Sequence, residues 1–222
     1  ARERRPEPAW FEARLARLET LRLSGRELYE RFLRPPAPNA SPEEKRQARR
    51  RAALPARETL EWVILRAVSS ANPVHEVAAD FFRNHFSVSI DKNRVREFVA
   101  DWEREILYKR ALGPFGDLLE ATAQHPCMLV YLDNFLSRRP ATSGEAARIE
   151  ALLGQKSFPP ESPAPPPPPL LRSRGLNENY ARELLELHTL GVDNFYTQKD
   201  VLQVALCLTG WTVGLRNGAP AF

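Results

Sequence analysis

Three groups of polar side chains border apolar helical stretches in this sequence of 222 residues. Imidazole and carboxylate groups that meet in a cleft suit general acid–base catalysis or the binding of a divalent cation. We therefore take His85, Asp133 and Glu183 as the candidate catalytic residues. The other polar members of these groups are candidate binding residues: Asn84, Asn134, Asn177, Glu178, Asn179, Arg182 and Glu186.

The same residues have a second interpretation, in which they form a buried hydrogen-bonded network that fixes the register of packed helices. The spacing alone leaves both interpretations open. No cofactor is evident, because the sequence has no Gly-rich phosphate loop, no Gly-x-Ser-x-Gly turn and no Cys-x-x-Cys pair. The histidines include no pair at i,i+4, so a metal site would need ligands from separate helices, and metal binding stays an open question.

Residues 177–191 are predicted to form the helix that carries most of the candidates. Asn177 is a favourable N-cap, and Gly191 can end the helix with a positive φ. Projection at about 100° per residue predicts one apolar arc with His188 in its middle, which is typical of a hydrogen-bonded core histidine. That arc contains Leu176, Tyr180, Ala181, Leu184, Leu185 and Leu187. The spacing of Arg182 and Glu186 on the opposite side predicts a solvated i,i+4 pair.

Other helices are marked by their starts and by their apolar stripes. Ser24 with Glu27 and Thr197 with Asp200 are capping-box patterns, and Asn72 precedes a proline at a first helical position. Pro126 is predicted to open a buried helix, with His125 at the junction before it. The longest apolar stripe is predicted to start after an Asp91 cap and to bury Val95, Phe98, Val99, Trp102 and Ile106.

Only residues 86–90 alternate like a strand, so the predicted fold is all-α, an irregular multi-helix bundle. Between residues 140 and 169 the composition changes sharply, to a segment that is too proline-rich to pack. We predict a basic N-terminal helical region at 1–56 and a helical domain formed by 57–136 and 175–213. A proline-rich mobile insertion is predicted at 137–174, and a truncated tail at 214–222.

The net charge of +4 is unevenly spread along the chain. A basic cluster between Lys45 and Arg51 could contact nucleic acid or anionic lipid, but it lacks interleaved aromatic residues, so nucleic-acid binding is not favoured. No apolar run reaches the ~18 residues of a membrane span, and no signal peptide is visible. Cys127 and Cys207 lie in apolar runs and are predicted to be buried thiols, with a disulfide between them left open. The first residue is Ala, which suggests a fragment of a longer protein.

Three segments resemble one bacterial family, known as domain of unknown function 1800. They are FFRNHFSVSIDK at 81–92, HPCMLVYLDN at 125–134, and NENYARELLELHTLGVDNFYTQKDV followed by LCLTGW at 177–211. The resemblance covers about residues 57–213. Relatives often have Trp-His where this chain has Phe82-Arg83, and commonly a Gly-containing turn where it has Asp193-Asn194-Phe195.

The resemblance implies an exported, extracytoplasmic protein that works beside a sulfatase-like partner. Because Arg182 and Glu183 fall in the most recognisable motif, it also favours a packed polar cluster over a solvated face. Two functions follow as hypotheses. One is a helical scaffold or interaction protein, and the other is a hydrolase-type enzyme with a polar or metal-assisted site between helices.

Overall fold

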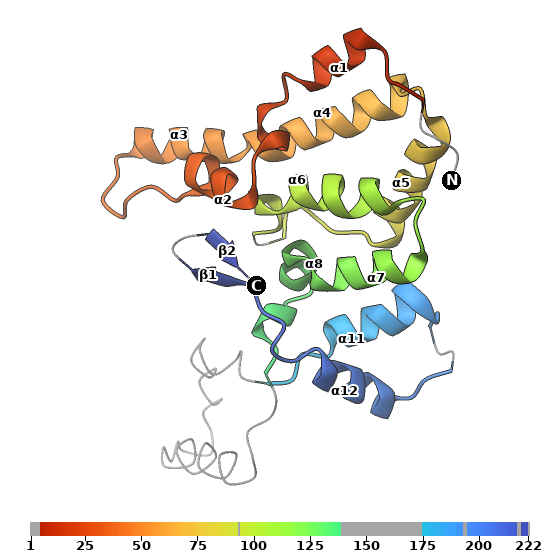
Figure 1. Ribbon diagram of the computed structural model, residues 1–222. Coiled ribbons are helices and arrows are strands. Elements are labelled where there is room, and N and C mark those ends of the chain that lie inside the picture. Colours follow the sequence, from red (N-terminus) through yellow and green to blue (C-terminus); the bar gives the residue numbers. More distant parts are fainter. Residues whose placement is uncertain (1–4, 93, 139–174, 193–194, 217–218, 222) are drawn as a thin grey trace. The chain divides into compact units, whose positions relative to one another are not determined.

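The computed structural model describes residues 5–92, 94–138, 175–192, 195–216 and 219–221, and these are predominantly helical (Figure 1). The helices up to residue 85 are α1 (Ala9–Leu15), η1 (Glu19–Arg22), α2 (Gly25–Leu28), η2 (Tyr29–Leu33), α3 (Pro42–Ala52), α4 (Leu54–Ser69) and α5 (Pro73–His85). They are followed by η3 (Val95–Glu97), α6 (Val99–Asp101), η4 (Trp102–Tyr108), α7 (Phe115–Gln124), α8 (Pro126–Tyr131) and η5 (Asn134–Leu136). The last helices are α11 (Asn179–Glu183), η6 (Leu184–Thr189) and α12 (Gln198–Cys207).

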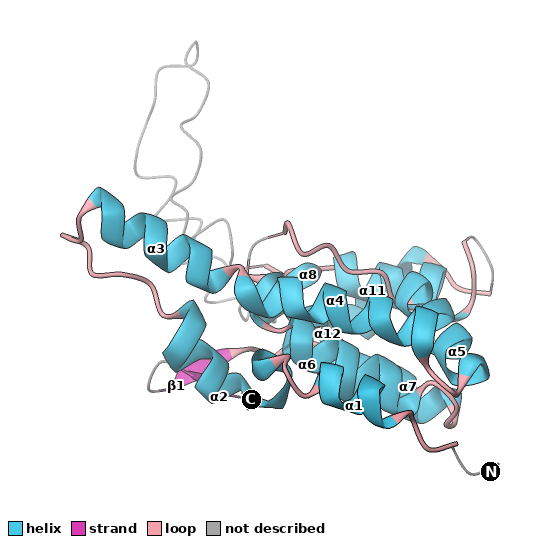
Figure 2. Cartoon of the chain, turned by 90° about the horizontal axis from the view of Figure 1, so that it is seen from above, coloured by secondary structure: helices cyan, strands magenta, loops and turns pink. Residues whose placement is uncertain are grey.

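The predicted all-α class is confirmed. Figure 2 colours the same chain by secondary structure and shows one short pair of strands beside the helices. Strand β1 (Gly214–Arg216) pairs antiparallel with β2 (Ala219–Ala221), so Gly214 lies opposite Ala221. The predicted proline-rich insertion lies outside the described residues except for Ser137 and Arg138.

The chain divides into two compact units, which we describe separately. Unit 1 comprises residues 1–132 and 213–222, and unit 2 comprises residues 133–212. The predicted boundary after residue 56 does not coincide with these units. The N-terminal helices share one apolar core with later ones, formed by Leu18, Leu21, Leu28, Phe32, Trp62, Ala79 and Tyr108 among others.

Unit 1 is built in rows of helices, with α4 beside α6 and α7 on the far side of the α6–η4 segment (Figure 1). Trp102 begins η4 in the middle of this stack and is only 1% exposed. The predicted inward position of Trp102 is therefore confirmed. Thr59 and Trp62 of α4 are buried as well, so the second and third turns of α4 face the same interior.

Helix starts follow the predicted capping chemistry in several places. The Ser24 backbone N–H donates to Glu27 Oε2 at 2.8 Å, and Thr197 and Asp200 exchange the corresponding bonds at the start of α12. His125 stands at the junction before α8, where its Nδ1 accepts the Cys127 N–H at 3.1 Å. Each of these bonds satisfies a backbone donor that the helix itself leaves free.

The segment between α5 and η4 differs from prediction. Residues 86–90 form no strand, since no neighbouring strand is described that could supply ladder hydrogen bonds. Asp91 does not start the next helix, which begins at Val95 with a 3₁₀ turn.

Asn72 makes no capping bond to α5, because its side chain bonds the Arg5 backbone and Glu7 instead.

The central helix also departs from the ideal projection. It begins at Asn179, and Asn177 serves its start by accepting the Asn179 N–H at 2.9 Å. From Leu184 it is a π-helix, in which the Leu190 N–H bonds the Leu185 carbonyl at 2.8 Å. Because a π-turn changes the angle between successive side chains, Leu187 is 57% exposed while His188 is buried as predicted.

Among the described residues of unit 2, two that are not glycine have left-handed backbones. Asp133 has φ 58°, a conformation that a short polar side chain tolerates, and it ends the turn before η5. Phe195 has φ 60° and its side chain is 95% exposed. Gly191, at φ 89°, ends the central helix in the way that the sequence predicts.

Candidate functional site

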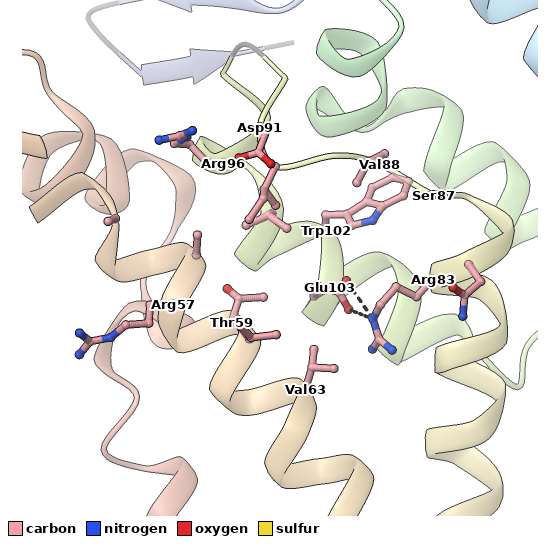
Figure 3. A pocket seen from close by; sticks show the side chains of 16 residues that line it. Arg57, Thr59, Val63, Arg83, Ser87, Val88, Asp91, Arg96, Trp102 and Glu103 are labelled. Atoms are coloured by element: carbon pink, nitrogen blue, oxygen red, sulfur yellow. Dashed lines mark hydrogen bonds and ion pairs between the residues drawn. The ribbon is translucent and has the colours of Figure 1, made fainter. Parts of the chain in front are cut away.

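A pocket of about 520 Å³ lies in unit 1, between α4, the end of α5 with its following loop, and the segment from Asp91 to η4 (Figure 3). Pockets of this size are typical of small-molecule sites. Its walls are mostly apolar, and their larger side chains are Leu60, Val63, Val88, Ile90, Val99 and Trp102. The pocket therefore offers a ligand an apolar interior with a few polar groups at its ends.

An ion pair occupies one end of the pocket. Arg83 Nε of α5 donates to both carboxylate oxygens of Glu103 in η4, at 3.1 and 3.0 Å (Figure 3). The Glu103 side chain is only 8% exposed, and that of Arg83 is 26% exposed. Arg83 Nη1 also donates to Asp80 Oδ1 at 2.7 Å. The pair joins α5 to η4 and places a desolvated carboxylate in the pocket wall.

Burial governs the protonation of Glu103. Removal from water disfavours the carboxylate and raises the pKa of Glu103, while the Arg83 guanidinium lowers it and offsets part of the effect. A carboxyl group with a raised pKa in a pocket is a candidate proton donor or acceptor. The same arrangement also serves as a structural link between two helices.

The opposite end of the pocket carries Asp91 and Arg96, which lie near each other in the upper part of Figure 3. Arg57 also borders the pocket, but its guanidinium points away from the interior (Figure 3). Within the described part of the chain, neither Arg57 nor Arg96 has a carboxylate within 4.0 Å. Arg96 is thus a cation at this rim without a carboxylate partner among the described residues.

The two predicted site residues of the first motif are placed differently. Asn84 lines the pocket, and its Nδ2 donates to the Asp80 carbonyl one turn earlier at 2.9 Å. His85 lies at the end of α5 among aromatic rings, with its ring 4.7 Å from that of Phe86 and 6.0 Å from that of Phe115. His85 is therefore part of an aromatic cluster and does not line the pocket.

Arg182 makes hydrogen bonds to polar residues of the central helix and of α12 in unit 2. It donates to Glu186 at 3.1 Å, to Glu178 at 3.4 Å and to Gln198 of α12 at 2.9 Å. Gln198 in turn donates to Glu178 at 2.7 Å. The Arg182 side chain is 41% exposed, so the prediction that Arg182 lies in a packed, desolvated polar cluster is wrong. Glu183 is half-buried and Asn179 is exposed, and neither is among these contacts.

The remaining candidates of unit 2 connect backbone segments. Asn134 is fully buried and its Nδ2 donates to the carbonyls of Leu208 and Trp211, at 3.1 and 3.3 Å. The backbone N–H of Asn177 donates to Ser137 Oγ at 3.1 Å. For Asn134 these bonds favour the structural-network interpretation. Asp133 has a left-handed backbone conformation. A catalytic role for Asp133 together with Glu183 and His85 stays a prediction.

Two charged residues central to unit 1 were not predicted. Glu103 lies next to Trp102 in the apolar stripe, and a carboxylate one residue from a buried tryptophan was the available signal. Arg66 is 7% exposed, pairs with Glu76 at 2.9 Å and Glu7 at 3.2 Å, and lies over the Tyr108 ring at 4.1 Å. Nothing in the spacing of α4 distinguishes Arg66 from a surface arginine.

Neither a metal centre nor a membrane span is found in the part of the chain that the structure describes. No group of three or more His, Cys, Asp or Glu residues there could hold a metal ion. No described helix is long and apolar enough to cross a membrane. Cys127 and Cys207 are both free thiols, and Cys207 is exposed rather than buried as predicted.

Comparison with known proteins agrees with the motifs. No protein of curated function and no solved structure matches the chain. One family model does match, described as protein of unknown function (DUF1800), and it covers residues 1–222, beyond the 57–213 over which the motifs alone show the resemblance. The chain therefore belongs to the DUF1800 family.

Proposed function

We propose that this chain is a binding protein whose pocket in unit 1 holds a small, mainly apolar ligand. The pocket has the volume and the apolar lining of a ligand site, with polar groups only at its ends. Six of its lining residues, Arg83, Asn84, Ser87, Val88, Ile90 and Asp91, come from the motif at 81–92. This overlap between a family motif and the pocket wall is the observation that carries the proposal.

The side chains that line the pocket also indicate what kind of ligand would fit it. Trp102, Val63 and Val99 would pack against a flat or branched apolar body, which is stabilised by about 25 cal/mol per Å² removed from water. Glu103 would accept a hydrogen bond, or donate one when protonated, and Arg96 would face a polar group at the other end. The ligand is therefore a compound of about drug size with a polar group at one or both ends.

Blocking the pocket tests this proposal. Val63→Trp fills the interior, and Val74→Trp adds the same side chain at a position on α5 that is 72% exposed and does not line the pocket. With 2-naphthol as the probe and ligand-observed NMR as the readout, we expect binding to the natural chain and to Val74→Trp. Val63→Trp should weaken it at least about tenfold. Equal binding to both variants would count against the pocket as the site.

A second candidate function is the scaffold or interaction protein that the family resemblance suggests, exported and paired with a sulfatase-like partner. It is favoured by exposed apolar side chains on two consecutive helices, since such patches mark interaction surfaces. On α4 they are Leu60, Ile64 and Val68, and on α5 they are Val74, Val77 and Phe81.

The interaction surface can be tested without disturbing the pocket. Ile64→Glu and Val77→Glu together should abolish association with the sulfatase-like protein in size-exclusion chromatography, because a buried charge at an interface is costly. Trp10→Glu and Leu112→Glu, at exposed apolar positions elsewhere in unit 1, introduce the same charge and provide the matched control. A complex that survives the first pair would remove this function, and 2-naphthol binding is expected to be the same in all of these variants.

A hydrolase remains the enzymatic alternative. Its candidates are His85, Asp133 and Glu183, to which the structure adds Glu103 as a group with a raised pKa in a pocket. Analysis of the purified protein for stoichiometric divalent metal is the direct test of a metal-assisted site. A bound metal would favour the enzyme over a simple binding protein.

A further inference from the structure

A second hollow in unit 1 has an otherwise apolar lining in which every charged side chain is a cation. It measures about 350 Å³ and lies between the end of η2, the loop after it and one face of α3. Arg34, Lys45 and Arg49 line it, and none of its other lining residues is acidic. None of the three cations has an ion pair with a described residue. These three side chains are exposed, and like charges that share a hollow without a counterion among the described residues attract an anion.

Prolines and local hydrogen bonds restrict the backbone around this hollow. Pro35, Pro36 and Pro38 restrict the loop, and the Ala40 N–H closes a turn on the Ala37 carbonyl at 2.9 Å. The capping box of Ser41 and Glu44 then starts α3. Because these segments are already ordered, an anion would not have to pay for ordering them, which favours binding.

The two acidic residues of α3 have partners of their own. Glu44 accepts the Ser41 N–H at 2.7 Å, and Glu43 pairs with Arg46. Arg50 and Arg51, which follow on α3, are exposed and also have no ion pair with a described residue. The uncompensated charge thus extends from the hollow along α3.

The side chains of α3 and of the hollow indicate which class of anionic ligand the site would bind. α3 buries no residue and carries no large apolar side chain, so it has no face for an amphipathic partner helix or for insertion into lipid. No aromatic side chain lines the hollow, so it offers no stacking platform for unpaired bases. We propose that Arg34, Lys45 and Arg49 bind a phosphate group, carried either by a small soluble anion or by a phospholipid head group.

A charge-matched pair of triple variants tests this site in the full chain. Arg34→Gln, Lys45→Gln and Arg49→Gln remove the three cations that line the hollow. Arg17→Gln, Arg22→Gln and Lys199→Gln remove three exposed cations elsewhere, so the change in net charge is the same. Pyrophosphate binding, measured by isothermal titration calorimetry in phosphate-free buffer at low salt, should fall at least about tenfold in the first triple variant only.

Vesicles identify the source of the phosphate. Binding to phosphatidylglycerol–phosphatidylcholine vesicles that is lost in the first triple variant and reversed by pyrophosphate would place the phosphate on a lipid. Pyrophosphate binding without vesicle binding would place it on a soluble anion. Equal pyrophosphate affinity in both triple variants would overturn the proposal. So would binding of a single-stranded oligonucleotide by a chain that binds neither pyrophosphate nor vesicles.

Discussion

At the scale of single residues, the pocket of unit 1 depends on the pair of Arg83 and Glu103. The pair joins two separate helices, α5 and η4, through residues 20 positions apart in the sequence. A carboxylate that is 8% exposed depends strongly on its one cationic partner. Loss of that partner leaves a buried charge, which costs more than the intact pair contributes.

We expect Arg83→Gln to destabilise the protein by about 1–3 kcal/mol at pH 8, below the figure for a fully buried pair because Arg83 is partly solvated. Burial raises the pKa of Glu103 in the folded protein, and removal of Arg83 raises it further. A raised carboxyl pKa costs stability above that pKa and nothing below the unfolded value, so the deficit should shrink as the pH falls from 8 to 5. Urea unfolding across this range is the measurement.

The double variant Arg83→Gln, Glu103→Gln is the control, because it has no ionisable group at this position. Its stability relative to the natural chain should depend much less on pH over the same range. A deficit in Arg83→Gln that stayed constant from pH 8 to pH 5 would show that Glu103 is not the titrating group.

At the scale of elements, much of the fold was predictable from local signals. Capping boxes at Ser24 and Thr197 and the burial of Trp102 depend on residues close in sequence, and these predictions are confirmed. The π-helix from Leu184 was not predictable from an α-helical projection, so Leu187 was assigned to the wrong face. Local chemistry thus predicts where helices begin better than how they are wound.

The site was less predictable than the fold. The pocket requires α4, α5 and η4 to meet, and its ion pair joins residues 20 positions apart. Asn84 was predicted as a polar residue at the end of an apolar helix and does line the pocket, whereas Glu103 was not among the predicted site residues. Arg182 shows the reverse case, because the spacing alone predicted a solvated i,i+4 pair and the structure has one. The resemblance misled there, since membership of a motif does not imply burial.

Helix η4 contributes the largest fully buried side chain of the fold, Trp102. Trp102→Ala should cost about 3–5 kcal/mol in urea unfolding, through lost apolar transfer and the cavity left behind. Trp10→Ala, at a side chain that is 60% exposed, should stay within about 0.5 kcal/mol of the natural chain. Similar losses at the two positions would mean that η4 does not form the centre of unit 1.

At the scale of the molecule, unit 1 is connected across long sequence separations by Arg66. Its guanidinium lies over Tyr108 and reaches Glu76 of α5 and Glu7 of the N-terminal segment. Glu7 also accepts the Ala71 N–H at 2.7 Å and the Ser70 hydroxyl at 2.7 Å. The segment before α1 is thereby attached to the turn between α4 and α5.

Glu7→Gln should weaken this attachment by about 1–3 kcal/mol at pH 7, because hydrogen bonds to a charged group are lost. Burial opposes the charge of Glu7, but hydrogen bonds from Ala71, Ser70 and Asn72, with Arg66, outweigh it and lower its pKa. Such a group stabilises the fold above its ordinary pKa, and its contribution is lost as the pH falls through the lowered one. The difference between Glu7→Gln and the natural chain should therefore shrink between pH 5 and pH 2.

Thermal unfolding at stepped pH checks this prediction, with Glu12→Gln on the exposed side of α1 as the matched control. The control should follow the natural chain within about 0.5 kcal/mol at every pH. A gap between Glu7→Gln and the natural chain that widened on acidification would contradict the assignment.

Phe195 is a position in unit 2 at which a substitution should make the folded chain more stable. A bulky side chain in the left-handed region costs about 1–2 kcal/mol, and one that is 95% exposed recovers almost nothing by burial. Phe195→Gly removes that conformational cost in exchange for about 0.5–1 kcal/mol of chain entropy, so a net gain of up to about 1 kcal/mol is expected. Phe195→Ala, which keeps a Cβ atom, should gain little, and an equal gain from both changes would point to the ring itself. The turn therefore offers a route to a more heat-resistant chain at a position remote in sequence from both proposed binding sites.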